Sequence, residues 1–374
     1  MLLRKQAASA PILNLTESNP TLCRFRSNSR SLLKAARSIR PVDYRPDPHG
    51  TKRARTAVSA FYGRKGIAVD PSRIFLHPGT SEAYAFIFRL LCNSGDTILA
   101  PAPSYPLLEH LARDSDVKCS SYRLAYDGEW RIDFHSLERA LAPRTRAIVL
   151  VHPNNPTGSF VMRDERKRLV EIAHRSGVAL IVDEVFDEYR HRDDSKRSDS
   201  FAGESRVLTF TLGGLSKTLG LPQLKLAWAV VSGPTQVRDE AIARLEWIHD
   251  TYLSVGVVPQ LMLPKLLRSA GMIAHEIGTR ARRNLQYCIR EVPGSGISVL
   301  TCEGGWSVIL QLPRVRSDER WALTLLREVG IYVHPGHFYG LEQESCIVAS
   351  LIVEEKVFHR GIQGVKHGVA LAVR

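Results

Sequence analysis

Lys217 has the setting best suited to covalent chemistry. It lies in Gly213-Gly-Leu-Ser-Lys-Thr-Leu-Gly220, directly after an apolar run that predicts a strand over 207–212. Glycines beside a lysine let the chain approach a ligand closely, and a partly desolvated amine can lose its proton and form a Schiff base with a carbonyl. A surface lysine in a flexible loop is the alternative. Eight residues on, Lys225 adds a second cation that could serve a phosphate.

Asp183 is the second candidate. It ends the apolar run Leu180-Ile-Val182 and begins Asp-Glu-Val-Phe186. A carboxylate at the end of a buried strand costs free energy unless it is paired. A pyridinium N–H would be such a partner, because it needs a buried anion to stay protonated. An aspartate that caps a helix explains the same residue equally well.

Three further segments have the residue types of ligand-binding loops. His152-Pro-Asn-Asn-Pro-Thr-Gly158 forms a fixed turn whose amides point at one spot. Pro78-Gly-Thr-Ser-Glu82 places backbone N–H groups and two hydroxyls at a helix start, where anions bind. In Pro101-Ala-Pro-Ser-Tyr-Pro106, a rigid loop holds Tyr105 where it could stack on a planar ring. A well-made turn, a capping box and a packed tyrosine are the respective alternatives.

The predicted elements would bring these segments together. From about residue 70 to 235, apolar runs alternate with helical patterns over 81–92 and 163–176, which indicates an α/β fold. Such runs are typical of strands buried on both faces of a parallel sheet, and ligands bind at the carboxyl ends of these strands. The predicted strands are 98–100, 147–151, 179–182, 207–210 and 226–231.

The two ends of the chain have other patterns. Residues 1–40 read as irregular and basic, and 235–290 as long helices. From about 297, strand-like stretches at 306–312 and 346–353 surround a helix at 317–329, which suggests a second domain of α+β type.

Composition excludes several classes of protein. The six cysteines of the 374 residues are scattered with no C-x-x-C pair, so no zinc site or disulfide framework is expected and a reducing cytoplasm fits. No apolar run reaches the ~18 residues of a membrane span, and the start lacks a secretory signal. The net charge of +13 is spread over the whole length. It favours small anions as ligands over nucleic acid.

In combination and order, these motifs resemble the class I/II aminotransferase family, the fold type I enzymes that depend on pyridoxal 5′-phosphate (PLP). The resemblance runs from about Asn14 to Gly364. It implies a large PLP-binding domain over 42–270 with a mostly parallel central sheet, a smaller α+β domain over 271–374, and a segment 1–41 that joins the small domain. The matching residues are Gly79-Thr-Ser81, Tyr105, Asn155, Asp183, and Ser216-Lys217 with its cation eight residues later.

The resemblance also implies roles. Lys217 would carry PLP as a Schiff base and then move the substrate proton, while Asp183 pairs with the pyridine nitrogen. Tyr105 would stack on the ring. Asn155 would bond the ring's phenolic oxygen, and it would contact substrate together with Asn19 of Leu15-Thr-Glu-Ser-Asn-Pro20. The phosphate would be held by Gly79, Thr80, Ser81, Ser216 and Lys225.

A homodimer is also implied, because Tyr44 matches a tyrosine that reaches into the neighbouring subunit's cofactor site.

Three positions near the cofactor depart from the family. Phe186, which would still contact the cofactor, stands where a tyrosine is common, and Tyr189 is a candidate substitute for the lost hydroxyl. Lys225 stands for an arginine, and Gly214 for a serine that often binds phosphate.

One departure concerns the substrate. Many relatives carry an arginine near the C-terminus that binds the substrate carboxylate, and here Val348 occupies that position. Four cations are candidate replacements, without ranking: Arg24, Arg45, Arg360 and Lys356. The segments 15–20, 250–255 and Val333-His-Pro-Gly336 suggest a subgroup of the family with a different carboxylate clamp.

The sequence therefore predicts a PLP-dependent aminotransferase, which moves an amino group between an amino acid and a 2-oxo acid. No metal, nucleic acid or membrane partner is expected. Another PLP reaction, such as that of a lyase, a decarboxylase or an oxidase, is the alternative. A non-catalytic PLP-sensing module is a further one, since one fold hosts many chemistries.

Overall fold

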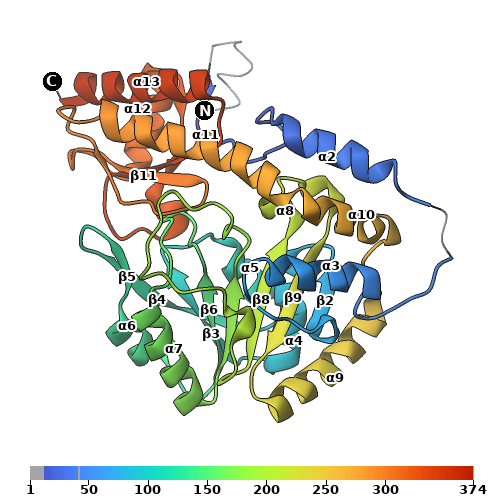
Figure 1. The fold of residues 1–374 in the computed structure, drawn as a ribbon. Coiled ribbons are helices and arrows are strands. Elements are labelled where there is room, and N and C mark those ends of the chain that lie inside the picture. The colour runs from blue at the N-terminus through green and yellow to red at the C-terminus, as the bar shows by residue number, and fades with distance from the viewer. Residues whose placement is uncertain (1–11, 41–42, 374) are drawn as a thin grey trace.

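The computed structural model of the chain describes residues 12–40 and 43–373. Within these residues, an eight-stranded sheet lies at one end of the molecule and a four-stranded sheet at the other (Figure 1). The strands of the large sheet, in spatial order, are β2 (Ile74–His77), β9 (Ala227–Ser232), β8 (Thr209–Gly214), β7 (Ala179–Asp183), β6 (Thr145–Val151), β3 (Thr97–Ala102), β4 (Lys118–Tyr126) and β5 (Trp130–Ile132).

The middle of the large sheet is parallel, as predicted. Strands β8, β7, β6, β3 and β4 run in one direction, and all five predicted strands are present. The prediction was wrong for β9, which pairs antiparallel with β8. Residues 215–226 return directly from β8 to its neighbour, without the crossover helix that a parallel pair needs.

Both faces of the sheet are buried, which explains the continuous apolar runs. In β6, Ile148 and Leu150 join an apolar cluster that includes Leu169 of α7. Ala147 and Val149, which point to the other face, join a second cluster with residues of α4, α5 and α9. The helices around the large sheet are α3 (Lys52–Gly63), α4 (Thr80–Leu91), α5 (Leu107–Asp114), α6 (Phe134–Ala140), α7 (Arg163–Ser176), α8 (Leu215–Thr218), α9 (Thr235–Tyr252) and α10 (Val257–Arg268).

The four-stranded sheet is antiparallel and is covered by C-terminal helices (Figure 1). The strand β1 (Leu13–Asn14) pairs with β12 (Ile331–Tyr332), so this N-terminal segment packs against the C-terminal part of the molecule. The strands of this sheet, in spatial order, are β10 (Ser298–Val299), β11 (Ser307–Gln311), β14 (Cys346–Ser350) and β13 (His334–Pro335), and the helices are α11 (Ala270–Glu291), α12 (Asp318–Glu328) and α13 (Glu355–Val373).

Helix α2 (Arg26–Ala36) corrects the expectation that residues 1–40 are irregular. The side chain of Phe25, which precedes the helix, does not cap it. Instead, the Glu276 carboxylate on α11 accepts hydrogen bonds from the backbone N–H groups of Arg26 and Ser27, at 3.1 and 2.8 Å. The start of this helix is therefore stabilised by a residue far away in the sequence. Among the described residues, no helix has the length and apolar character needed to cross a bilayer.

Burial of the imidazole lowers the pKa of several histidines. Burial lowers the pKa of His152 and of His191 to about 4, and that of His249 to about 2, from an ordinary value of 6.5. The His249 ring lies 4.8 Å from that of Phe75 and 4.9 Å from that of Phe86, measured between centroids. These imidazoles are neutral in the folded chain, so acid favours unfolding.

We expect the free energy of unfolding to fall as the pH drops from about 6.5 towards 4, by up to about 1.4 kcal/mol per pH unit for each such histidine. The folded pKa values lie below the unfolded one, so the unfolded chain binds more protons in this window, and this stability is complete above pH 6.5. Urea unfolding at several pH values is the measurement. The aromatic variant His249→Phe should show a shallower loss, and an unchanged slope would contradict the neutral state of His249.

Candidate active site

The carboxyl ends of β6, β7 and β8 open onto a cavity of about 380 Å³, next to the small sheet. Parallel strands place the residues that follow them at one edge, which is why motifs distant in sequence meet here. The cavity is lined by predicted site residues from five segments, namely Thr80, Ser81, Tyr105, Asn155, Asp183, Phe186, Ser216 and Lys217.

Lys217 lies in α8, which starts directly after β8. Its Nζ is 5.4 Å from the ring centroid of Trp306 and 5.9 Å from that of Phe186. Burial lowers the pKa of this amine, and the charge of Asp183 opposes that effect. The end of β8 before it requires glycine, since a Cβ on Gly213 would come 2.6 Å from the ring of Trp228, its partner on β9. The sequence thus places a desolvated amine in the cavity.

Asp183 ends β7, and its carboxylate is held by two donors. The backbone N–H of Val185 donates to Oδ1 at 3.1 Å, and the Tyr84 hydroxyl donates to Oδ2 at 3.2 Å. Burial raises the pKa of Asp183 to about 6, while the two hydrogen bonds and the charge of Lys217 oppose the rise. The carboxylate is therefore oriented in the cavity without a cation bonded to it among the described residues.

Tyr84 was missed by the sequence analysis. It lies on α4, four residues after Thr80, and lines the same cavity. Residues four apart share one face of a helix, so this spacing was a usable signal. Trp306, Ser307 and Ser350 were also missed, because they come from the small sheet and its flanks. His334 lies in the segment 333–336 that was singled out for the carboxylate clamp, but no role was assigned to its side chain.

Gly79 and Lys225 lie together at the N-terminus of α4, outside the cavity lining. A Cβ on Gly79 would sit 3.5 Å from Lys225 Nζ, so the glycine keeps a small space open beside the ammonium group. The free N–H groups of the first helical turn and the hydroxyls of Thr80 and Ser81 complete surroundings suited to an anion.

Tyr189 does not substitute for the hydroxyl missing at Phe186. Its side chain is fully buried, and its hydroxyl donates to the main-chain carbonyls of Lys217 and Thr218, at 2.6 and 3.2 Å. The residue instead fixes the turn that carries Lys217. Phe186 lines the cavity with its ring edge-on to Trp306.

Asn155 links the two parts of the molecule. Its side-chain oxygen accepts a hydrogen bond of 2.9 Å from the Ser307 hydroxyl on β11, which leaves its amide N–H groups for a ligand. The neighbouring Asn154 donates to the Pro103 carbonyl at 2.9 Å, in the loop that carries Tyr105. The Tyr105 side chain is half exposed at the cavity.

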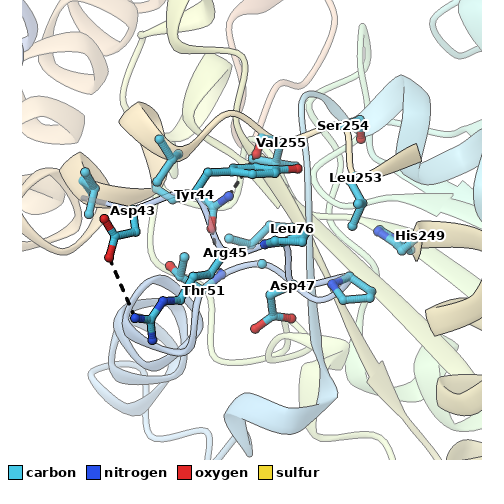
Figure 2. A pocket seen from close by; sticks show the side chains of 16 residues that line it. Asp43, Tyr44, Arg45, Asp47, Thr51, Leu76, His249, Leu253, Ser254 and Val255 are labelled. Carbon is cyan, nitrogen blue, oxygen red and sulfur yellow. Dashed lines mark hydrogen bonds and ion pairs between the residues drawn. The ribbon is translucent and has the colours of Figure 1, made fainter. Parts of the chain in front are cut away.

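Tyr44 and Asn19 lie outside the cavity. Tyr44 is 73% exposed and lines a separate pocket of about 220 Å³ with Leu76, His249 and Val255 (Figure 2). The side-chain oxygen of Asn19 accepts from the backbone N–H and the hydroxyl of Thr21. The nearby residues Thr16 and Ser18 line the cavity in its place.

None of the four cations considered as replacements lines the cavity: Arg24, Arg45, Lys356 and Arg360. The side chains of Arg24 and Arg45 are largely exposed, and each is paired with a nearby carboxylate, Glu354 and Asp43 respectively. Val348, by contrast, is buried in the wall of the cavity.

Comparison with known proteins identifies the family to which this sequence is similar. The sequence model described as "Aminotransferase class I and II" matches residues 10–355. The glutamate-pyruvate aminotransferase AlaA of Haemophilus influenzae is 27% identical over 339 residues, which cover 87% of this chain and 82% of the relative. The S-alkyl-thiohydroximate lyase SUR1 of Arabidopsis thaliana is 29% identical over 221 residues, or 58% of this chain and 47% of the relative.

The fold is shared with solved structures. The alanine aminotransferase from Pyrococcus furiosus superposes with a TM-score of 0.89 at 20% identity, covering 99% of this chain and 95% of that one. This agreement confirms the fold type I architecture, with its mostly parallel central sheet. The match of the family over nearly the whole length establishes that this chain belongs to the class I and II aminotransferases.

Proposed function

We propose that this aminotransferase moves an amino group between an amino acid and a 2-oxo acid, with PLP bound at Lys217. The observation that carries the proposal is the pairing of a buried amine with a buried carboxylate in one cavity. A protonated pyridine nitrogen would supply the counter-charge that Asp183 lacks. The raised pKa of this carboxyl group thus fits the cofactor.

The remaining residues fit the other groups of PLP. Gly79, the start of α4 and the Lys225 ammonium suit the phosphate, because both free N–H groups and positive charge are present. The Asn155 amide suits the phenolic oxygen, and the Tyr105 ring suits one face of the pyridine. When bound, PLP supplies an aldehyde and a ring that withdraws electrons from the substrate α-carbon.

Lys217 would move the substrate proton. Its lowered pKa makes a neutral amine available as the base that takes the proton from the α-carbon and returns it later. Asp183 would keep the ring nitrogen protonated, and the two rings of Phe186 and Trp306 would limit the access of water to the amine.

A lyase reaction is the second candidate, favoured by the similarity to SUR1. The two can be separated by mixing the PLP-loaded protein with one amino acid at a time, without an acceptor. We expect one equivalent of 2-oxo acid per site and no ammonia. Catalytic release of ammonia would instead indicate elimination. A protein that stays colourless with PLP and traps no adduct on borohydride reduction would contradict the proposal.

Three related expectations remain predictions. A homodimer in which Tyr44 reaches the partner's site agrees with the high exposure of this side chain. Sedimentation or light scattering would give the oligomeric state. A cytoplasmic location and the domain boundaries at 41 and 270 remain predictions as well.

A further inference from the structure

One wall of the cavity is formed by a single face of the small sheet. Ser307 on β11 is paired with Ser350 on β14, and Val348, two residues earlier on β14, is paired with His334 on β13. Directly paired residues, and residues two apart on a strand, share a face. All four side chains therefore lie on the same face, and all four line the cavity.

A substrate bound in this cavity brings a negatively charged carboxylate that the lining residues must stabilise. An amino acid or 2-oxo acid carries a carboxylate beside its reacting carbon, and burying that charge costs free energy unless donors meet it. Among the described residues that line the cavity, Lys217 and His334 are the two with basic side chains. Lys217 is needed for the proton transfer, which leaves His334.

His334 is oriented by its neighbours. The Tyr339 hydroxyl lies 3.0 Å from its Nδ1, and the Tyr339 main-chain carbonyl accepts a 2.9 Å hydrogen bond from the Ser104 N–H. If the hydroxyl donates to Nδ1, the imidazole carries its proton on Nε2, where it can donate to a ligand. Burial lowers the pKa of His334, which favours this neutral form.

Three further donors on described residues that line the cavity have no partner, and the Ser104 hydroxyl is one of them. The Ser350 hydroxyl and the Trp306 indole N–H are buried, and the described residues offer neither a hydrogen bond. The backbone N–H of Ser350 donates to the Leu15 carbonyl at 2.7 Å, which fixes the end of the strand. Buried polar groups are nearly always satisfied, and a ligand that accepts hydrogen bonds could give donors of these lining residues a partner.

We propose that His334 binds the carboxylate of the substrate, assisted by the Ser350 hydroxyl and the Trp306 indole N–H. The substrate carboxylate is then held by uncharged hydrogen-bond donors, because Val348 provides no cation on this wall of the cavity. This inference rests on the proposed function and assigns a part of the same site to substrate recognition.

The test uses the PLP-loaded protein and a 2-methyl amino acid, which carries the carboxylate but has no α-proton to lose. Its dissociation constant is measured by calorimetry. We expect His334→Ala to weaken binding about 10- to 100-fold, since the variant loses a hydrogen bond to a charged group. His334→Gln keeps a donor and should recover part of the affinity.

His337→Ala is the matched control, because His337 is a nearby histidine that pairs with Asp318 and lies outside the cavity lining. It should bind the ligand as the wild type does. The amide of the same amino acid lacks the negative charge. His334→Ala should therefore weaken the binding of this amide much less than it weakens the binding of the acid.

Equal affinity of the wild type and His334→Ala for the acid would overturn the inference and point to a cation from elsewhere, such as Arg45 of a second copy. A wild type that releases no oxo acid from any amino acid would instead contradict the proposed function. The two failures are therefore distinguishable.

Discussion

Lys217→Ala is expected to abolish amino transfer, with kcat falling by at least about 10³-fold. Lys217 is the one lysine among the described residues that line the cavity, and its lowered pKa supplies the neutral amine on which the reaction depends. Two measurements apply: the rate at saturating PLP and amino acid, and the mass of the peptide that carries Lys217 after borohydride reduction. In the wild type, this peptide should gain the pyridoxyl group.

Lys225→Ala is the matched control for this experiment. Lys225 is an exposed lysine that lies beside Gly79 and outside the cavity lining. Its removal should weaken PLP binding, because a cation near the phosphate is lost, but turnover should persist when PLP is saturating. Retained transamination in Lys217→Ala, or a pyridoxyl group found on another lysine, would contradict the role assigned to Lys217.

The strands of the central sheet were predictable for a physical reason. Strands such as β6 are buried on both faces over most of their length, so 147–151 is a continuous apolar run that is visible in the sequence. Strand β4 was not recognised, because exposed polar residues such as Lys118 and Arg123 interrupt its pattern. Helix α2 escaped prediction because the acceptor for its first N–H groups is Glu276.

In the candidate site, too, some residues were predictable from the sequence and others were not. Lys217, Asp183 and Asn155 follow consecutive parallel strands, so the topology alone predicts that they meet. The segment of His334 was singled out from sequence, but the meeting of His334 and Ser350 at one wall could not be predicted, since their position depends on how β13 and β14 pair in a second sheet. No local pattern encodes that register.

Tyr189 shows the limit of arguments from spacing. Its distance along the chain from Phe186 allowed its hydroxyl to replace the missing one in the site. In the fold, the hydroxyl is consumed by main-chain carbonyls of the turn at Lys217. The spacing of residues along the chain indicates on which side of a segment a side chain lies. The packing of the fold determines which group that side chain contacts.

Asp183→Asn is expected to lower kcat by roughly 10²- to 10³-fold, the range lost when a preorganised electrostatic partner is removed from an active site. The amide is nearly isosteric with the carboxylate, but its single oxygen can accept from only one of the two donors, Val185 or Tyr84. Besides that one hydrogen bond, the variant loses the negative charge that would keep a ring nitrogen protonated. The measurement is the single-turnover rate with an amino acid at saturating PLP.

Tyr84→Phe provides the comparison that isolates the charge. It removes one hydrogen bond of 3.2 Å to Asp183 and leaves the carboxylate in place, so we expect a loss of only about 1 kcal/mol, or roughly fivefold in rate. A PLP analogue methylated on the ring nitrogen separates the two effects further. Its positive charge is permanent and needs no anion to retain a proton, so Asp183→Asn should recover activity with the analogue relative to PLP. If Asp183→Asn and Tyr84→Phe proved equally active, or the analogue gave no recovery, Asp183 would be acting through the packing of the cavity and its charge would have no part in the reaction.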